Sequence, residues 1–373
     1  MPFAKVESHP IVSPKPALMK NLSLLLLLLS VVHSISAQDD LLLKDFRPES
    51  IYNTSNTVIE RAKYPVIDFH AHPNAATKKE LEEWVSTMKG HNIEKSIILT
   101  YSTGQRFDSI YDMYAQYGDQ FELWCGFDYT GYNEPGWTKK AIKELERCFA
   151  KGARGVGELG DKGLGLFYSK PSKAPGLHID DPRLQPLLKR CGELGMPISI
   201  HVADPYWMYL PMDQKNDGLM NAYTWKIDRS KEGLLSHQEL LTSLSNAVKN
   251  NRGTTFIACH LANCSHDLDI LGKLLDEHPN LYADISARYA EVAPVPRRTK
   301  RFFEKYKDRL VYGTDMGMDD TMYRTTFKIL ESADEHFYAW DYFSYHWPLN
   351  GLDLNDETLK KIYHENGRKL IKR

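Results

Sequence analysis

The sequence predicts an α/β fold of the closed (β/α)8 type, the TIM barrel, with a long insertion after strand 5. After residue 60, short apolar runs alternate with segments of helical periodicity, and strands separated by helices of this length pair in parallel. Eight such repeats fit a closed barrel better than an open doubly wound sheet. No GxGxxG motif follows the first strand, which disfavours a dinucleotide-binding fold.

Eight segments have the composition of buried strands. In chain order they are residues 66–72, 95–101, 121–129, 153–159, 196–202, 254–261, 280–288 and 308–315. The segments between them have helical periodicity; the stretch "KKELEEWVSTMKG", for example, places four apolar side chains on one face and ends at Gly90. The barrel domain therefore spans residues 60–373, and its last segment, "LNDETLKKIYHENGRKLIKR", is expected to pack under the barrel as an amphipathic helix.

The insertion after strand 5 spans residues 204–235 and is rich in aromatic side chains, including Trp207. Long loops of this kind in compact domains often form lids or walls of a site. We therefore expect the insertion to cover the barrel mouth, with Trp207 touching a substrate. A packed subdomain or an interface patch is the alternative interpretation.

Residues 1–37 form an N-terminal extension that ends in a predicted signal peptide, Met19–Ala37. Lys20 supplies a positive start, an apolar run follows, and small residues before Ala37 suit cleavage. The apolar run is short for a membrane span, although a signal anchor is an alternative. The mature chain is expected to begin near Gln38, to have no stable membrane span, and to be exported, either periplasmic or secreted.

The overall composition limits the class of protein. Of the 373 residues, 42% are hydrophobic and 26% charged, and the formal net charge of −2 offers no electrostatic footprint for nucleic acid. The five cysteines are scattered and form no CxxC pair, so we interpret most of them as small core residues. A small-molecule substrate is the expected partner, and a homo-oligomer is left open.

Polar residues gather at the predicted strand ends, beginning with "VIDFHAHP" at residues 66–73. Because alternate side chains of a strand share a face, Asp68, His70 and His72 are expected to lie together. Further polar residues end the later strands: Glu158 the fourth, His201 the fifth, His260 the sixth and Asp315 the eighth. In a barrel these ends converge on one mouth.

Each of these residues has an ordinary alternative role. A lone His201 or His260 is often a core histidine bonded to backbone, and Glu158 or Asp315 suits a turn or a helix cap. Their convergence from separate chain passages instead predicts a shared metal site, because imidazole and carboxylate bind zinc, manganese or iron(II). Asp68 either supports the ligands or fills a polar barrel layer.

These motifs resemble the metal-dependent amidohydrolase superfamily. "VIDFHAHP" is similar to its strand-one motif and "VYGTDMG" to its strand-eight motif, and the C-terminal stretch resembles the amidohydrolase-related branch, which includes decarboxylases of the aminocarboxymuconate-semialdehyde type. The resemblance implies a divalent metal, zinc before manganese or iron, held by His70, His72, Glu158, His201 and Asp315. Glu158 stands where many two-metal members use a carboxylated lysine, and "GVGELG" looks more like the TatD-type hydrolases, so one or two ions are implied.

The resemblance implies a metal-dependent hydrolase of an amide, lactone or ester bond, acting through metal-activated water. Asp315 is the expected general base, and His260 either binds a second metal or polarises a carbonyl. Arg288, Lys162 and Trp207 are expected to bind a small acidic or ring-containing substrate; a salt bridge is the alternative role for Arg288. Non-oxidative decarboxylation, and an exported binding protein without catalysis, are the other hypotheses.

Overall fold

The computed structural model describes residues 41–231, 233–340 and 345–371. The predicted signal segment, Met19–Ala37, lies outside the described residues. The chain divides into two compact units at Arg47, and the described part of the first contains only the short helix η1 (Leu43–Asp45). Over the described ranges, no helix combines the length and the apolar character that crossing a membrane requires.

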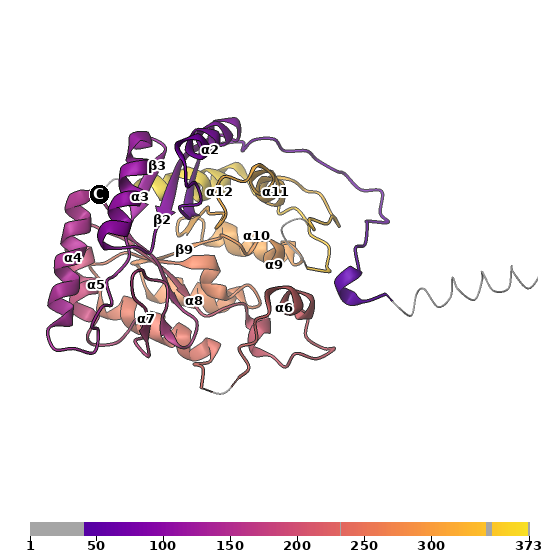
Figure 1. The fold of residues 1–373 in the computed structure, drawn as a ribbon. Helices are drawn as coiled ribbons and strands as arrows, with labels where there is room; N and C mark the ends of the chain where they lie inside the picture. The colour runs from indigo at the N-terminus through magenta and orange to yellow at the C-terminus, as the bar shows by residue number, and fades with distance from the viewer. Residues whose placement is uncertain (1–40, 232, 341–344, 372–373) are drawn as a thin grey trace, which may run out of the picture. The chain divides into compact units, whose positions relative to one another are not determined.

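The second unit, residues 48–373, alternates strands and helices (Figure 1). Its strands are β1 (Val66–Ala71), β2 (Ile93–Leu99), β3 (Phe121–Trp124), β4 (Val156–Asp161), β5 (Gly165–Leu166), β6 (Ala174–Pro175), β7 (Ile198–Val202), β8 (Phe256–Ala258), β9 (Leu281–Asp284) and β10 (Leu310–Val311). Its longer helices are α2 (Lys78–Gly90), α3 (Gly104–Tyr114), α4 (Trp137–Lys151), α5 (Gln185–Glu193), α7 (His237–Asn250), α8 (Leu268–Glu277), α10 (Pro296–Lys305) and α11 (Asp320–Glu331). The shorter ones are η2 (Ala115–Tyr117), η3 (Tyr206–Tyr209), α6 (Leu219–Trp225), η4 (Cys259–Asn263), α9 (Tyr289–Val292), α12 (Asp356–Lys360), η5 (Lys361–Glu365) and α13 (Asn366–Ile371).

Eight of the strands close into a parallel barrel. Ladders join β1 to β2 to β3, and β4 to β7 to β8 to β9 to β10. A bridge between Cys125 and Val156 joins β3 to β4, and the amide of Phe69 donates to the carbonyl of Tyr312 at 2.9 Å, which joins β10 to β1. The predicted (β/α)8 barrel is confirmed, and each of the eight predicted strand segments contains or overlaps one of these strands.

The interior of the barrel is apolar below its mouth. One core cluster draws buried side chains from β1, β2, β3, β8, β9 and β10, namely Ile67, Phe69, Ile97, Leu99, Trp124, Ile257, Tyr282 and Val311. Leu370 of α13 belongs to the same cluster, and the amide of Tyr312 donates to Ile362 at 2.9 Å. The C-terminal segment therefore closes one end of the barrel, as predicted, and leaves the other end for chemistry.

The first strand contains a register irregularity that changes one prediction. Its pairing with β2 advances from Asp68 opposite Ser96 to Ala71 opposite Ile98, three residues against two. Strict alternation therefore fails after Asp68. The Asp68 carboxylate accepts bonds from the amide (3.0 Å) and hydroxyl (2.7 Å) of Thr314, away from the apolar interior side chains. The prediction that it shares a face with His70 was wrong.

The helices follow the predicted amphipathic patterns. In α2 the buried side chains are Leu81, Trp84, Val85 and Met88, and a capping box between Thr77 and Glu80 begins the helix. Helices α4, α5 and α7 lie along the outside of the strands (Figure 1). The insertion 204–235 contains η3 and α6, and an unpredicted antiparallel pair, β5 and β6, extends the sheet beyond β4.

Candidate metal centre

The predicted ligands converge at one mouth of the barrel. His70 is the last residue but one of β1, His72 directly follows the strand, Glu158 lies in β4 and His201 lies in β7. Asp315 Oδ1 lies 3.4 Å from His70 Nε2 and 3.0 Å from His72 Nε2. Glu158 Oε1 lies 2.9 Å from His201 Nδ1. The sequence therefore identified a real cluster of side chains.

His260 joins this cluster from an unexpected backbone conformation. The predicted strand 254–261 ends at Ala258, and His260, Leu261, Ala262 and Asn263 all have left-handed φ values between 52° and 60°. Such values cost non-glycine residues roughly 1–2 kcal/mol each, so surrounding contacts must hold the turn. It places His260 Nε2 at 3.3 Å from Glu158 Oε1.

Three of the histidines use Nδ1 to fix their rings. His70 Nδ1 lies 2.9 Å from Asp284 Oδ2, His72 Nδ1 lies 2.9 Å from the carbonyl of Leu99, and His260 Nδ1 lies 3.0 Å from the carbonyl of Ser286. Each Nε2 is thereby directed toward the carboxylates of the cluster. This is the arrangement by which outer partners orient metal-binding imidazoles.

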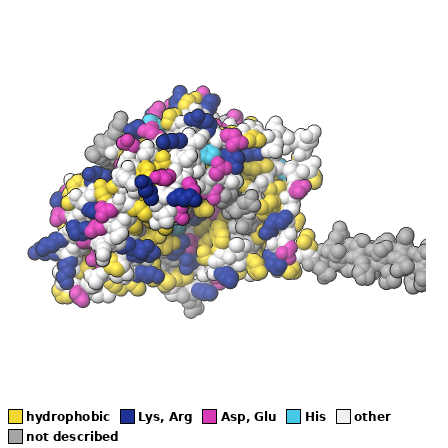
Figure 2. All heavy atoms as spheres, turned by 45° about the horizontal axis from the view of Figure 1, so that its top comes forward, with side chains coloured by type: hydrophobic (Ala, Val, Ile, Leu, Met, Phe, Trp, Pro, Cys, Tyr) yellow, Lys and Arg dark blue, Asp and Glu magenta, His cyan; other side chains and the backbone are white. Residues whose placement is uncertain are grey.

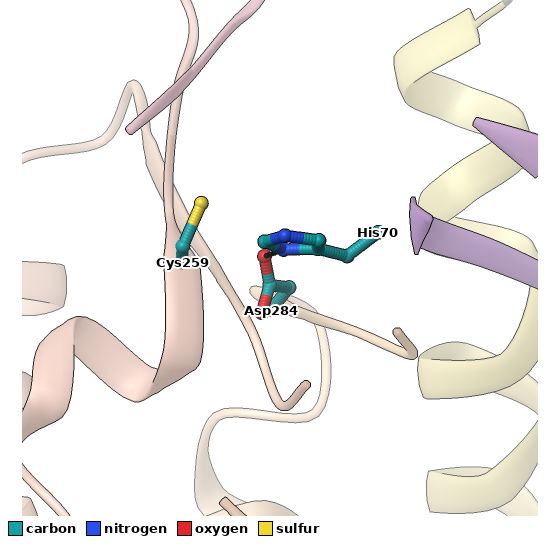
Figure 3. Close-up of side chains that lie close together, drawn as sticks. All are labelled: His70, Cys259 and Asp284. Carbon is teal, nitrogen blue, oxygen red and sulfur yellow. Dashed lines mark hydrogen bonds and ion pairs between the residues drawn. The ribbon is translucent and has the colours of Figure 1, made fainter. Parts of the chain in front are cut away.

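Asp284 is the residue of this centre that the sequence reasoning missed. Its carboxylate binds His70 and accepts bonds from the His260 amide (2.8 Å), the Ser286 amide (3.0 Å) and the Ser286 hydroxyl (2.5 Å). Figure 3 shows the His70 ring directed toward this carboxylate and the Cys259 side chain. Tyr282, two residues earlier, faces the barrel interior, so strand alternation was the signal that would have found Asp284.

Burial and charge together set the protonation of the cluster. Burial alone would raise the pKa of Glu158, but the hydrogen bond and charge of His201 hold it well below its usual range. Burial likewise opposes ionisation of Asp284, yet His70 lowers its pKa to about 2. Burial, with His201 nearby, lowers the pKa of His260 to about 4. At neutral pH the carboxylates are therefore ionised, and the His260 imidazole is uncharged.

The donor set fits a divalent cation. His70 Nε2 and His201 Nε2 are buried and have no hydrogen-bond partner within the described chain. Donor atoms fall within 4.8 Å of one another in three overlapping groups at the mouth, which are His70–His260–Asp315, His70–His72–Glu158 and Glu158–His201–His260. A cation would satisfy unpaired imidazole nitrogens and neutralise buried carboxylates, and nitrogen with oxygen ligands suits zinc, manganese or iron(II).

Arg288 lies near the cluster, although not at a strand end as predicted. It precedes α9, four residues beyond β9. Its Nε and Nη2 donate to Asn263 Oδ1 at 2.8 and 2.5 Å, and the Asn263 amide donates to the carbonyl of Val202 at 2.9 Å. Asn263, another residue missed from the sequence, thus ties Arg288 and the left-handed turn to β7. Substrate binding by Arg288 stays a prediction.

Lys162 and Trp207 have partners within the fold. Lys162 Nζ lies 2.8 Å from Asp204 Oδ1, and Arg229 of the insertion binds the other oxygen of Asp204 at 2.7 Å. Trp207 is buried in the insertion, 5.9 Å from the ring of Trp225. Among the described residues, Lys162 lines the cavities at the cluster and Trp207 does not. Their roles toward a substrate stay predictions.

Two cavities open onto the cluster. The larger, of about 860 Å³, is lined by His72, Glu158 and residues of the loop around β5 and β6. The smaller, of about 330 Å³, is lined by the insertion, Arg288 and residues after β10. Both include His201, His260 and Asp315 in their walls. Each volume lies within the range of about 300–1,000 Å³ that is typical of small-molecule sites.

Comparison with known proteins agrees with this architecture. Residues 67–373 match the family model described as Amidohydrolase. The chain belongs to the amidohydrolase family. Among proteins of curated function, none matches the sequence significantly. The family assignment covers both motif-bearing ends of the barrel, from β1 to the C-terminal helix.

Solved structures share the fold at low identity. A putative amidohydrolase from Staphylococcus aureus is 17% identical with a TM-score of 0.51, and the match covers 82% of this chain and 99% of that one. A 2,6-dihydroxybenzoate decarboxylase from Rhizobium is 15% identical with a TM-score of 0.50, over 83% and 99% of the two chains. These neighbours confirm the TIM-barrel fold. One of them is named as an amidohydrolase and the other as a decarboxylase.

Proposed function

We propose that this amidohydrolase-family chain is a metal-dependent hydrolase that cleaves an amide, lactone or ester bond in a small acidic substrate. The observation that carries the proposal is the convergence of four histidines and two carboxylates, with three of the rings fixed through Nδ1. So many buried polar groups in one place are costly unless they bind something together. The cluster opens onto a cavity large enough for a substrate.

His70, His72, Glu158, His201 and Asp315 would hold the ion, with His260 as a further ligand if a second ion binds. A divalent ion there supplies Lewis acidity and makes a coordinated water acidic near neutral pH. Zinc is the expected metal, before manganese or iron. The groups His70–His72–Glu158 and Glu158–His201–His260 share only Glu158, so they would offer ligands to one ion or to two.

The chain's own residues then move the protons. Asp315 lines both cavities, its side chain is about one-third exposed, and burial is outweighed by His70, so its pKa stays well below the usual range. It is therefore an ionised acceptor at the cavity wall, placed to take a proton from water and return it to the leaving group. His260 remains neutral and offers Nε2 to a substrate carbonyl or to an ion.

Non-oxidative decarboxylation is the second candidate. Arg288 and His260 line the same small cavity, where a guanidinium would hold a carboxylate beside a neutral imidazole. However, the Arg288 Nε and Nη2 atoms already donate to Asn263, and its Nη1 atom donates to the carbonyl of Ala287. These bonds use three of the five N–H groups of the guanidinium. The decarboxylase hypothesis therefore requires Arg288 to hold a carboxylate through the two that remain, one on each Nη atom, whereas the hydrolase hypothesis requires no such contact.

Isotope incorporation separates the two reactions. The metal-loaded protein is incubated with N-acyl amino acids, lactones and hydroxybenzoates in water enriched in oxygen-18 and, separately, in deuterium oxide. Hydrolysis places oxygen-18 in a product carboxylate, whereas decarboxylation releases carbon dioxide and places deuterium on carbon. Oxygen-18 incorporation that disappears in Asp315→Asn supports the proposal, and deuterium on carbon without oxygen-18 would overturn it.

We also propose that the mature chain begins near Gln38 and is exported. The predicted signal peptide, Met19–Ala37, supports this proposal. N-terminal sequencing of the protein recovered outside the cytoplasm tests it. An intact Met1 or Met19 on the recovered protein would contradict the proposed cleavage.

A further inference from the structure

The geometry points to a substrate with two chemically different ends. We propose that an acidic group of the substrate lies in the larger cavity and an apolar group in the smaller one, with the scissile bond between them at His260 and Asp315. This inference rests on the proposed hydrolase function and specifies its substrate class. It depends on three features. The two cavities meet at the catalytic cluster, the larger cavity contains cations without an ion-pair partner, and the charged groups of the smaller cavity are already paired.

The two cavities meet at the catalytic cluster. Lys162, His201, His260 and Asp315 line both of them. A substrate that reaches Asp315 therefore has space in two directions, about 860 Å³ on one side and about 330 Å³ on the other. A molecule cleaved in its middle would place one product in each cavity.

The larger cavity has unpaired positive charge at its outer end. Arg106, Lys170 and Lys173 line it, and none of the three forms an ion pair within the described residues. Lys170 and Lys173 instead lie over the rings of Tyr101 and Phe167, at 5.2 and 5.6 Å from the ring centroids. The carboxylates of this cavity, Glu158 and Asp315, belong to the metal cluster at its inner end. Three cations without a carboxylate partner favour an anionic group.

Lys170 is held in place by its backbone. Its amide donates to the carbonyl of Tyr101 at 2.9 Å, and its own carbonyl accepts from the amide of Thr103 at 3.1 Å and the hydroxyl of Thr103 at 3.2 Å. These bonds fix the loop between β5 and β6 against the segment after β2, while the ammonium group lies over the Tyr101 ring. The backbone that carries Lys170 is therefore fixed at the wall of the larger cavity. Figure 2 shows a hollow with an apolar floor on one face of the molecule, with Lys and Arg side chains and some Asp and Glu side chains around it.

The charges of the smaller cavity are already paired. Asp204 lies between Lys162 (2.8 Å) and Arg229 (2.7 Å), and Arg288 Nε lies 3.8 Å from Glu291 Oε2. The remaining wall is largely apolar and is made by Pro205, Met208, Trp225, Ile227, Met316, Met322 and Tyr345. The Tyr345 hydroxyl donates to Glu291 at 2.6 Å, which leaves its ring for packing. A cavity of about 150 Å³ holds benzene, so 330 Å³ accommodates a phenyl-sized group.

Three matched probes test this inference on the full-length protein. N-phenylacetyl-L-aspartate has both ends, N-phenylacetyl-L-asparagine amide has the same shape without charge, and N-acetyl-L-aspartate lacks the ring. Binding is measured by calorimetry at low and high salt on the chelated, metal-free protein, in which the proposed hydrolysis cannot proceed. The variants are Lys170→Gln with Lys173→Gln, Trp225→Ala, and Lys189→Gln of α5 as a remote control.

The double variant Lys170→Gln/Lys173→Gln should weaken binding of N-phenylacetyl-L-aspartate by about 5- to 20-fold. Added salt should reduce this effect, because exposed ion pairs are modest in strength and are screened by salt. The double variant should leave the uncharged analogue unaffected. Trp225→Ala should weaken both phenylacetyl probes by about 5-fold and spare N-acetyl-L-aspartate. Lys189→Gln should change nothing. Equal effects on charged and uncharged probes, or no binding of N-phenylacetyl-L-aspartate to the metal-free protein, would overturn the two-ended substrate.

The proposed function can fail separately. If the probes bind with this selectivity but the metal-loaded wild-type protein hydrolyses none of them, the two-ended site stands and the hydrolase assignment falls. If it hydrolyses charged and uncharged probes with the same kcat/KM, the hydrolase assignment stands and the two-ended site falls.

Discussion

The carboxylate of Asp284 offers a sensitive test of how the metal centre is built. Asp284→Asn keeps the shape of the side chain and removes its charge. In the structure this carboxylate receives four hydrogen bonds, from His70 Nδ1, the His260 amide, and the amide and hydroxyl of Ser286, all of them fully or almost fully buried. An asparagine amide offers one acceptor oxygen and turns an N–H group toward one of these donors. The variant should therefore lose the orientation of His70 and His260 together.

The expected loss follows from the role of such outer partners. Changing one of them typically costs 10- to 100-fold in metal affinity, which is about 1.4–2.7 kcal/mol. Unfolding of the metal-free variant should need roughly 1–3 kcal/mol less free energy, because a buried donor is left without its acceptor. Competition with a fluorescent zinc chelator measures the affinity, and urea unfolding followed by circular dichroism measures stability.

Asp276→Asn is the matched control, since Asp276 lies exposed on α8 and pairs with Lys305 and Tyr306. It should bind zinc like the wild type. A folded Asp284→Asn protein with zinc affinity within twofold of the wild type would refute the reasoning, because the orientation of two ring nitrogens would then not depend on this carboxylate.

Three further predictions concern the ligands, the left-handed turn and pH. His72→Ala should lose metal and activity together, as metal analysis and kinetics would show, whereas His178→Ala should keep both; retained metal stoichiometry in His72→Ala would remove it from the ligand set. Asn263→Ala should lower the free energy of unfolding by about 2–3 kcal/mol, because it leaves buried Arg288 without its acceptor, and an unchanged urea midpoint would contradict this. The bond from His178 to Asp161 raises the pKa of His178, so its stabilisation is present below the unfolded pKa of about 6.5 and is lost as pH rises through the higher folded value. The difference in Tm between wild type and His178→Gln should therefore shrink from pH 6 to pH 9, and a constant difference would contradict the linkage.

Much of the fold was predictable because its elements have strong periodic patterns. The apolar face of α2 predicted a helix that packs on the sheet. The alternation of strands with helices predicted a parallel sheet, and eight such repeats favoured a closed barrel. The lengths of the strands were less predictable. The sixth strand stops at Ala258 because the next residues enter a left-handed turn, which local composition does not indicate.

The candidate site shows the same division. His70, His72, Glu158, His201, His260 and Asp315 were predicted as a group, because strand ends converge in a barrel whatever the loop lengths. Asp284 was missed even though it follows Tyr282 on the same strand face, and Asn263 was missed because its role depends on the fold of a turn. Asp68 was misplaced because one extra residue in β1 breaks the alternation on which the prediction depended.

Stepwise metal reconstitution of the chelated protein tests the central claim most directly. Zinc is added in known equivalents, and bound metal and hydrolysis of an N-acyl amino acid, lactone or ester substrate found by the oxygen-18 assay are measured on the same samples. We predict no hydrolysis without metal, a rise in parallel with bound zinc, and saturation at one or two equivalents per chain. Full hydrolytic activity in the metal-free protein, or zinc bound at full occupancy in a His70→Ala/His72→Ala variant, would contradict the assignment.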